Sequence, residues 1–521
     1  MISGIAIENF KGVREKIELE LRPITLLFGP NSAGKSTITD ALDYFEALLI
    51  TRSASLGNLS SRKAGDNNKE LSFERLIHNH DLYRTMRLGV ECELTCEDEG
   101  YMSVKGTSNT NSSEDWGLPT SYDLNFADDL RTLEIEFEIK GTIAHFDGGL
   151  INSAEISRFV VKYNDELLAA VQPIHETSGR LNGFRWTVDL ANPLIPIDLE
   201  QSGIIEFDNY HFQLIPVEHD PPLTGGLYKA SVAGQEIPNA AVANYLNALL
   251  LGAFRIMGHR LRQRKTIAGI RAVPDRNSIP MPADSPSRWN NGLAAWDYLA
   301  YCGEDSLNEV NLWLGSKHLG TGYQLKQRKL VDLNECFGIV RAITKNNDSD
   351  SAQAFLKLQS GAERRVGFVP GDNPYLRNGP FLHPSDVGTG LSQIVPVLVA
   401  SSDPKPSFIS IAQPDLHLHP RLQAELSDVF VQAINRAEAP RFLLETHSEH
   451  LILRLLRRIR ETAIGEAPEG CELRTEELGI YFVSQENGAT KIEMIEADIR
   501  GEFIQPWPDD FFELDFHERF G

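Results

Sequence analysis

The sequence predicts a mixed α/β protein, and three observations indicate this fold class. Near the start, an apolar stretch at residues 24–28 runs into a glycine-bearing loop and then into a helical pattern. From residue 385 onward, apolar strand-like stretches again alternate with helical patterns. Between these regions, residues 97–237 have strand composition and residues 238–316 are mostly helical in pattern. We therefore expect an α/β fold built around a phosphate-binding loop, with a β-rich insertion and a helical region.

The bulk composition is that of a large acidic protein. The chain has 521 residues, 41% of them hydrophobic and 24% charged, with a formal net charge of -23 at pH 7. That charge argues against a general nucleic-acid coat, because phosphate binding needs Lys and Arg to displace counterions. The longest apolar runs, such as residues 394–400, are too short to span a bilayer. Because the N-terminus also lacks the layout of a secretory signal, we expect a cytoplasmic protein.

The motif positions divide the chain into four expected segments. They are an N-terminal lobe (1–96), a β-rich insertion (97–237), a helical and mixed region (238–384) and a C-terminal lobe (385–521). Residues 51–70 are rich in Ser, Gly and Asn and are predicted to form a mobile loop. A short hairpin is expected in "IYFV…KIEMIE", followed by an aromatic tail that packs on the fold. The tail residues are Trp507, Phe511, Phe512 and Phe516.

The strongest motif is "ITLLFGPNSAGKSTITDAL", which has the strand, loop and helix context of a phosphate-binding loop. Gly29 and Gly34 let the backbone curl so that its N–H groups point inward. Lys35 reaches the β- and γ-phosphates, Ser36 can ligate magnesium, and the helix N-terminus favours an anion. The chain is therefore expected to bind a nucleoside triphosphate. The residues expected to hold it are Gly29, Pro30, Asn31, Ser32, Ala33, Gly34, Lys35, Ser36 and Thr37, with Ser36 as the metal ligand.

Three later stretches follow in a recognisable order. "SDVGTGLSQIVPVLVA" (385–400) is a glycine-bearing turn that opens an apolar helix, and "SFISIAQPDLHLHP" (407–420) begins as a buried strand. "RFLLETHSEHLILRLLRRI" then contains a strand that ends near His447. A phosphate loop, a Gly/Ser helix start, a buried strand and a strand-terminal His form the order of elements in ABC-type ATPase heads.

These stretches resemble the SMC/Rad-like and OLD-like ABC ATPases of prokaryotes, in particular the single-chain heads of antiphage defence systems of the Septu, retron and PARIS type. "IRAVPDRNSIP", "GLAAWDYLA", "EVNLWL" and the tail "GIYFVSQENGATKIEMIEADIRGEFIQPWPDDFF" also look like segments that those proteins carry. The resemblance covers both ends and the stretch from about 267 onward, but not the region from about 97 to 235. It implies ATP and magnesium as ligands.

The resemblance also implies that ATP joins two copies of the head. Lys35 and Ser36 of one copy would hold the phosphates and magnesium, and His447 would be the switch histidine near the γ-phosphate; a core histidine is the other reading. The signature turn would donate to the γ-phosphate held by the second head. Its residues are Gly388, Gly390, Ser392 and Gln393. His417 and His419 are spaced like a metal pair, yet the family carries "HLHP" there without a metal.

The resemblance places an acid at position 412 and a general base at position 413. Here the run is Ile411-Ala412-Gln413-Pro414-Asp415. Alanine offers magnesium no ligand, and neutral Gln413 orients water but is a poor proton acceptor. Because the other motifs are intact, the pattern favours a substitution that blocks turnover, and a natural pseudo-enzyme is the alternative. We expect slow ATP hydrolysis in this chain, and faster hydrolysis in Ala412→Glu.

The expected role is an ATP-gated sensor or scaffold that controls a separate effector, such as an HNH or Toprim-like nuclease, because no Toprim domain follows the head. A DNA-repair or chromosome-maintenance ATPase is the alternative, supported by a basic run at 255–276. A nuclease within the insertion is a further candidate, but the alternation of its acids favours a solvated face. Those acids are Asp128, Asp129, Glu134, Glu136 and Glu138. The five scattered cysteines are expected to be structural thiols.

Overall fold

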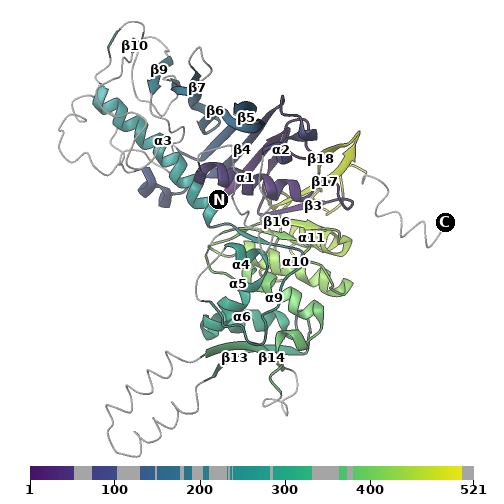
Figure 1. Cartoon of the computed structure of the whole chain (residues 1–521). Coiled ribbons are helices and arrows are strands. Elements are labelled where there is room, and N and C mark those ends of the chain that lie inside the picture. Colours follow the sequence, from purple (N-terminus) through teal and green to yellow (C-terminus); the bar gives the residue numbers. More distant parts are fainter. Residues whose placement is uncertain are drawn as a thin grey trace, which may run out of the picture. The chain divides into compact units, whose positions relative to one another are not determined.

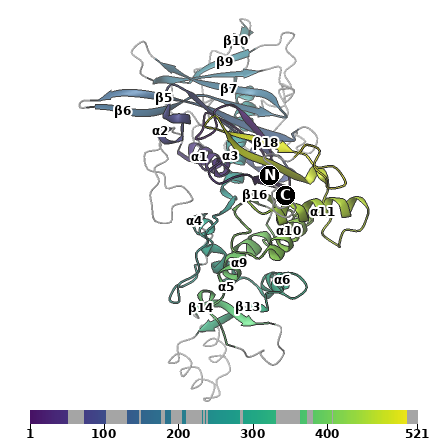
Figure 2. The same cartoon turned by 90° about the vertical axis from the view of Figure 1, so that its right-hand side faces the viewer.

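The computed structural model describes most of the chain, in two compact units (Figures 1 and 2). Unit 1 comprises Met1–Arg264 and Gly479–Met494, and unit 2 comprises Lys265–Leu478 and Ile495–Gly521. The described residues are 1–51, 73–102, 130–146, 149–175, 181–189, 204–209, 231–232, 235–236, 239–281, 286–330, 363–371, 380–405 and 407–506. Residues 52–70 of the expected loop, the acids Asp128 and Asp129, and the aromatic tail lie outside them.

Unit 1 contains an eight-stranded antiparallel sheet that runs through the expected insertion. Alternating apolar residues predict these strands, and the alternation places one apolar face inward. The pairing of β4 with β5 makes the sheet continuous across residue 96, while the four-segment division stays a prediction. In order along the sheet the strands are β2 (Ile17–Glu20), β1 (Ile2–Glu8), β4 (Thr85–Glu93), β5 (Thr132–Phe146), β6 (Gly149–Tyr163), β7 (Glu166–His175), β8 (Leu181–Asp189) and β9 (Ile204–Asn209).

Two helices, α1 (Ser36–Thr51) and α3 (Asn239–Arg262), cover one face of this sheet. A row of aromatic contacts connects them through the sheet, with ring centroids 5.1 Å apart for Phe45 and Phe137, and 5.4 Å apart for Phe159 and Phe254. Just beyond α3, the fully buried guanidinium of Arg264 pairs with the carboxylates of Asp43 and Glu46 on α1. The core therefore fixes the helix that follows the phosphate loop.

The strand before that loop, β3 (Ile24–Phe28), is buried at every residue and lies next to β17 (Leu478–Glu486), which neighbours β18 (Ala489–Ile495). The expected "IYFV…KIEMIE" hairpin is thus present. Its two-residue turn is Asn487-Gly488, both with positive φ (51° and 78°), as a type I′ hairpin turn requires.

Unit 2 contains three parallel strands in the order β12 (Lys265–Ile267), β15 (Phe408–Ala412) and β16 (Arg441–Thr446). The nearly continuous burial of β15 and β16, which are mostly apolar, is typical of strands covered on both faces. Helices α9 (Thr389–Ser401), α10 (Pro420–Ile434) and α11 (Glu449–Ala463) alternate with β15 and β16 along the chain. The expected mixed α/β fold is confirmed in both units.

The remaining described part of unit 2 consists of helices and a two-stranded sheet. Helices α4 (Pro286–Asn290), α5 (Leu293–Tyr301) and α6 (Glu304–Leu314) lie in the region where helical patterns were predicted. Strands β13 (Tyr323–Leu330) and β14 (Glu363–Pro370) pair antiparallel. The smaller elements of the chain are α2 (Phe73–Leu76), β10 (Ser231–Val232), β11 (Gln235–Glu236), and the 3-10 turns η1 (His78–His80), η2 (Cys96–Met102), η5 (Pro384–Asp386) and η6 (Thr475–Glu477).

Candidate functional site

The phosphate loop between β3 and α1 needs glycine at two positions. Gly29 has φ of 149° and Gly34 has φ of 107°, a region that L side chains rarely adopt. A Cβ at Gly29 would lie 2.0 Å from the carbonyl oxygen of Val483, and one at Gly34 would lie 2.4 Å from Oγ1 of Thr490. The loop therefore lies directly against the C-terminal hairpin, and only glycine fits at either contact.

Lys35 lies within the curl of this loop. Its side chain folds back so that Nζ donates to the carbonyl oxygens of Gly29 (2.8 Å) and Pro30 (2.7 Å), and only 8% of the residue is exposed. Ser36 begins α1 and is exposed. An ammonium held on carbonyls in this way can exchange them for phosphate oxygens, which form stronger charge-assisted hydrogen bonds.

The C-terminal hairpin holds the loop from outside. Thr490 Oγ1 donates to the carbonyl of Ala33 at 3.0 Å, and Gln485 Nε2 donates to the carbonyl of Ser32 at 3.0 Å. The backbone N–H of Thr490 also donates to the carbonyl of Gly12 at 2.8 Å. Sequence reasoning predicted the hairpin but not this support. A threonine in an ordinary strand gives no sequence signal for such a contact.

In unit 2, Ala412 ends β15 and the chain then turns sharply. Gln413 has a positive φ of 46°, and its backbone N–H donates to the carbonyl of Glu445 at 2.6 Å. Ala412 and Glu445 are register partners on β15 and β16. Asp415 is buried beneath the turn, where its Oδ1 accepts a hydrogen bond of 2.6 Å from Thr446 Oγ1. Burial raises the pKa of Asp415, while the Thr446 hydroxyl lowers it.

Arg271 ties three stretches of unit 2 together. Its guanidinium donates to the carbonyl oxygens of Ala412 (2.9 Å), Gln413 (3.0 Å) and Gln393 (3.1 Å). Only 2% of the residue is exposed, and burial lowers its pKa to about 10, with Asp415 acting in the opposite direction. Sequence reasoning counted Arg271 as surface charge. Its place beside apolar residues in "AGIRAVP" was the available signal for burial.

The signature turn opens α9, with Gly388 as the residue before the helix. A Cβ at Gly390 would lie 2.7 Å from the carbonyl oxygen of His417, so this turn lies close to the segment that follows β15. Ser392 is buried, and its hydroxyl donates to the carbonyl of Thr389 at 3.0 Å. The structure thus brings the signature turn and the end of the 412–417 segment together.

Gln393, near the start of α9, is bonded through its side-chain amide to the backbone of Arg271. Its Nε2 donates to the carbonyl of Arg271 at 2.6 Å, and its Oε1 accepts from the backbone N–H of Arg271 at 2.9 Å. Both halves of the amide are therefore bonded to one backbone residue. Gln393 thus positions Arg271, and its expected role as a donor to phosphate stays a prediction.

His447 is half-buried after the last residue of β16. Its charge lowers the pKa of Asp415, so it lies within electrostatic reach of the turn after Ala412.

The residue after His447, Ser448, caps α11 by accepting a hydrogen bond from the backbone N–H of Leu451 at 3.1 Å. His419 similarly caps α10. Among the described residues, no His, Cys, Asp and Glu side chains group in a way that could hold a metal ion.

The basic run at 255–276 does not form a free cationic face in the structure. Three of its cations pair with acids of their own unit, namely Arg260 with Asp98 and Arg264 with Asp43 in unit 1, and Lys265 with Asp403 in unit 2. The other partners are carbonyls or acids: Arg255 donates to Tyr101, Arg271 to Ala412, and Arg276 to Asp386. Two acids of the insertion are also paired, Glu134 with Lys162 and Glu138 with Arg87 and Arg158.

Comparison with protein families identifies ATPase domains at two places in the chain. Residues 1–143 match the family described as "AAA ATPase domain". Residues 348–454 match the family described as "AAA domain, putative AbiEii toxin, Type IV TA system". The first match contains the phosphate loop and the second contains the signature turn, β15 and His447. By these matches the chain is an ATPase with AAA-type domains.

Solved structures of SMC heads are similar to this chain at a distant level. The SMC head bound to the C-winged helix domain of ScpA has a TM-score of 0.39 and 11% identity, over 95% of this chain and 97% of that one. The SMC head domain from Thermotoga maritima has a TM-score of 0.35 and 10% identity, over 95% and 99%. The Pyrococcus furiosus Smc head with an extended coiled coil, bound to the C-terminal domain of ScpA, has 0.36 and 11%, over 95% and 96%. Similarity at this level transfers no activity or partner.

No curated protein matches the chain. Among the described residues, no helix is both long and apolar enough to cross a membrane.

Proposed function

We propose that this chain is an ATP-gated sensor or scaffold subunit of an antiphage defence complex that controls a separate effector. The proposal that the chain binds ATP rests on one observation, namely the loop in which Gly29 and Gly34 leave room for Lys35, just before α1. The AAA-type matches at both ends of the chain agree with it. The antiphage role comes from the sequence resemblance described above.

The loop fits a phosphate group. Its backbone curls around Lys35, its two glycines exclude side chains from the contacts, and the N-terminus of α1 adds a favourable dipole. Ser36 provides an exposed hydroxyl for a magnesium ion, which would neutralise charge on the phosphates. Ala412 adds no ligand, and its register partner on the neighbouring strand is Glu445.

A second copy of the chain is the proposed partner of the loop. The signature turn of one copy would face the phosphates that Lys35 of the other copy holds. Nothing lies within 4 Å of a Cβ built on Gly388, so the start of α9 is open to an incoming anion, which a helix N-terminus favours. Ser392 lies in the first turn of the same helix.

Hydrolysis in such a pair is expected to be slow. Gln413 is neutral and held by its backbone in a left-handed turn, so its amide orients water but does not accept a proton. Slow hydrolysis extends the lifetime of the ATP-bound pair of chains. A long-lived pair suits a subunit that signals to an effector while ATP is bound.

The test is ATP-dependent pairing. Light scattering of the purified chain should show a dimer with ATP and magnesium and a smaller species without ATP. Lys35→Ala should abolish both ATP binding in calorimetry and dimerisation, because it removes the ammonium that contacts the phosphates. Lys317→Ala is the matched control, since Lys317 is exposed in unit 2. If the chain binds ATP but does not dimerise, ATP does not control pairing and that part of the proposal is wrong. If the chain does not bind ATP, the whole proposal is wrong.

The effector needs a separate experiment. Copurification with the products of neighbouring genes should recover an HNH or Toprim-like nuclease, and protection of cells against phage should depend on Lys35. Protection that persists in Lys35→Ala cells would separate any defence role from ATP binding.

The alternative is a DNA-repair or chromosome-maintenance ATPase that acts directly on DNA. Its main sequence support was the run at 255–276, whose cations have partners within the fold. Salt-dependent DNA binding by the purified chain would favour this alternative, because phosphate contacts release counterions. We expect none at physiological salt.

A further inference from the structure

The segment that follows β12 in unit 2, residues 268–281, is called the strap here, and it contains Arg271. Its backbone is fixed on both sides of that arginine. The backbone N–H of Ala268 donates to the carbonyl of Asn290 at 2.8 Å, and the backbone N–H of Ala272 donates to the carbonyl of Asn291 at 2.7 Å. The strap is therefore held against the end of α4.

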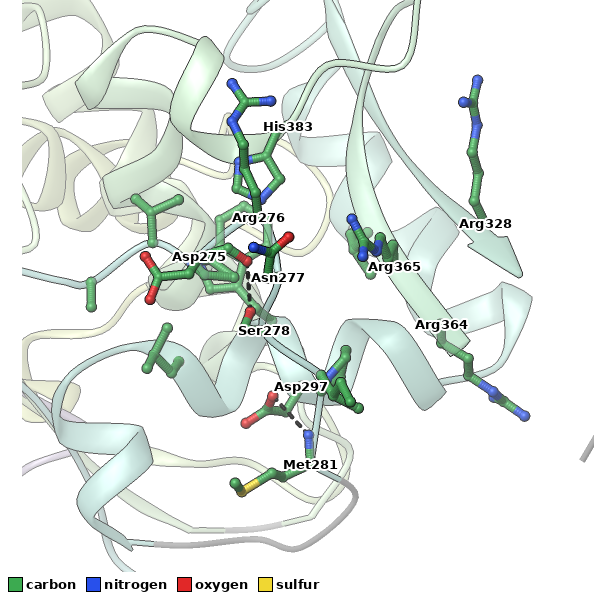
Figure 3. A pocket seen from close by; sticks show the side chains of 18 of the residues that line it. Asp275, Arg276, Asn277, Ser278, Met281, Asp297, Arg328, Arg364, Arg365 and His383 are labelled. Carbon is green, nitrogen blue, oxygen red and sulfur yellow. Dashed lines mark hydrogen bonds between the residues drawn. The ribbon is translucent and has the colours of Figure 1, made fainter. Parts of the chain in front are cut away.

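The strap is also anchored further along, where residues 272–281 line the pocket in Figure 3. The backbone N–H of Met281 donates to Oδ1 of Asp297 on α5 at 3.0 Å. The guanidinium of Arg276 pairs with the carboxylate of Asp386 in the turn η5, just before the signature turn. The strap thus connects α5 with the start of α9.

Arg271 is buried between these anchors, whereas the residue before it, Ile270, is 82% exposed. The side-chain amide of Gln393 holds the backbone of Arg271 from α9. Gly292, which precedes α5, has φ of 82°, and a Cβ added there would lie 2.9 Å from the Cβ of Arg271. Only glycine suits that position. The place of Arg271 is therefore set from two helices.

The guanidinium of Arg271 is a buried cation that donates to backbone carbonyls. Its Nη2 donates to both Ala412 and Gln413, and its Nη1 donates to Gln393. Its Nε has no hydrogen-bond partner among the described residues. Burial of a charge with a donor left unsatisfied is costly, and methionine would fill similar space without a charge. What distinguishes arginine here is the planar fork that it presents to two successive carbonyls at the end of β15.

Those two carbonyls belong to the turn that carries Gln413. This residue has φ of 46°, which is uncommon for a residue other than glycine, asparagine or aspartate. Its carbonyl accepts from Arg271, and its backbone N–H donates to Glu445. The side chain of Gln413 also lies against the strap, because a Cβ added at Gly269 would lie 3.0 Å from its Oε1. The strap thus contacts both the backbone and the amide of Gln413.

We propose that Arg271 is a positioning residue for ATP hydrolysis and that it acts through Gln413. The inference rests on the proposed function, in which the amide of Gln413 orients the attacking water. Displacement of such a group by about 1 Å lowers a reaction rate strongly, and the fork of Arg271 holds the turn in its uncommon conformation. Because Gln393 in turn holds Arg271, the signature helix α9 and the water-orienting amide belong to one hydrogen-bonded network.

The test is a double-mutant cycle between Arg271 and Gln413 in the full chain, with phosphate release giving kcat and KM for ATP. Arg271→Lys keeps the charge but replaces the fork with a compact ammonium. We expect kcat to fall by roughly tenfold or more, while KM and the calorimetric affinity for ATP change by less than about twofold. In a chain that carries Gln413→Ala, Arg271→Lys should lower kcat by less than about twofold, because the group that it positions is gone.

Gly269→Ala tests the same path and leaves Arg271 in place. Gly269 is not among the described glycines with positive φ, so alanine suits its backbone, and the added Cβ displaces the amide of Gln413. We expect kcat to fall by about threefold or more, and this loss should also disappear in Gln413→Ala. The small substitution keeps the proposal testable if circular dichroism shows that Arg271→Lys does not fold.

Arg458→Lys is the matched control. Arg458 is another buried arginine of unit 2, and it pairs with Asp428 and Glu461 on α10 and α11. The control should lower the thermal unfolding temperature and leave kcat within about twofold of the native value. A general loss of stability is thereby separated from a loss of positioning.

Three outcomes overturn the proposal. The first is that Arg271→Lys or Gly269→Ala lowers kcat equally with and without Gln413→Ala, and the second is that ATP affinity falls as much as kcat. The third is that Arg271→Lys keeps the native kcat, or that the native chain releases no more phosphate than Lys35→Ala. Failure of the ATP gate has a different signature, since the native chain would then not bind ATP or not dimerise.

Discussion

Ala412 and Glu445 are register partners at the ends of the parallel strands β15 and β16. Side chains paired in this way point to the same face of a sheet. Glu445 is buried, with 6% of its surface exposed. A carboxylate therefore lies beside the position where the sequence resemblance places an acid and this chain has alanine.

Replacing Ala412 with Glu adds a second carboxylate next to Glu445. Because like charges on neighbouring strands repel, we expect Ala412→Glu to lower the free energy of unfolding by up to about 1 kcal/mol without magnesium. A bound divalent cation removes that repulsion, so magnesium and ATP should stabilise the variant more than the native chain. Thermal unfolding with and without both ligands measures this difference, and Ala412→Gln is the uncharged control.

The same variant should hydrolyse ATP faster. An acid at position 412 supplies a ligand near the metal, and we expect phosphate release to rise by roughly tenfold or more. Equal phosphate release by the native chain and Ala412→Glu would remove the argument that residue 412 limits turnover.

Glu445 itself can be tested by removing its charge. If its carboxylate serves the metal that Ala412 cannot, Glu445→Gln should reduce the gain in ATP affinity that magnesium gives by about tenfold, or about 1.4 kcal/mol. Calorimetric titration of ATP with and without magnesium measures that gain. Glu472→Gln is the control, because Glu472 is exposed. A magnesium effect unchanged in Glu445→Gln would assign Glu445 to packing alone.

Thr490 is expected to support the phosphate loop through its hydroxyl. Thr490→Val keeps the shape but removes the bond to the Ala33 carbonyl, so it should cost about 1 kcal/mol of stability and weaken ATP binding. Thr490→Ser keeps the hydroxyl and should retain ATP binding. Calorimetry and urea unfolding check both, with Thr475→Val as a control whose hydroxyl contacts the exposed side chain of Glu476. Equal losses in the two valine variants would contradict the prediction.

Arg264 lies between two acids of α1 with its side chain fully buried. Arg264→Leu leaves Asp43 and Glu46 buried without their cation, so we expect a loss of about 3 to 5 kcal/mol in the free energy of unfolding. The comparison is Arg457 on α11, whose side chain is 54% exposed and pairs with Glu461, which also pairs with Arg458. Arg457→Leu should cost less than about 1 kcal/mol. A loss of unfolding free energy in Arg264→Leu no larger than that in Arg457→Leu would show that other groups stabilise Asp43 and Glu46.

Asp415 should make stability depend on pH. Burial raises its pKa above the ordinary 3.8, although Thr446, His447 and Arg271 act in the opposite direction. An acid whose pKa is raised on folding stabilises the fold below its unfolded pKa, and that contribution is lost as pH rises through the folded value. Asp415→Asn keeps an acceptor for Thr446 and removes the titration.

The measurement compares urea unfolding at about pH 4 and about pH 8. Relative to the native chain, Asp415→Asn should be more stable at the higher pH than at the lower one. The same difference between the two proteins at both pH values would show that the raised pKa does not contribute to folding.

The sequence predicted the local features well. The phosphate loop, the Asn487-Gly488 turn and the strands of the insertion each depend on a short run of residues whose backbone preferences are readable. It did not reveal how those strands pair. The insertion continues the N-terminal sheet because β4 and β5 pair, and the alternation in each strand indicates a buried face without indicating a neighbour.

Long-range polar contacts were the main failure. Arg271 and Gln393 are 122 residues apart, and their mutual bonds have no trace in local composition. The charges of the 255–276 run lie close together in sequence, but Arg260, Arg264 and Lys265 pair with different acids in the fold. A count of cations along the chain therefore overstated the basic surface.

The bond from Thr490 to Ala33 spans 457 residues. At translation speeds of about 5 to 20 residues per second, the ribosome needs on the order of 20 to 90 seconds to travel between them. During that interval the phosphate loop has been synthesised but the hairpin that contacts it has not. A product truncated ahead of the hairpin would therefore lack the hydrogen bonds that Gln485 and Thr490 make to the carbonyls of Ser32 and Ala33.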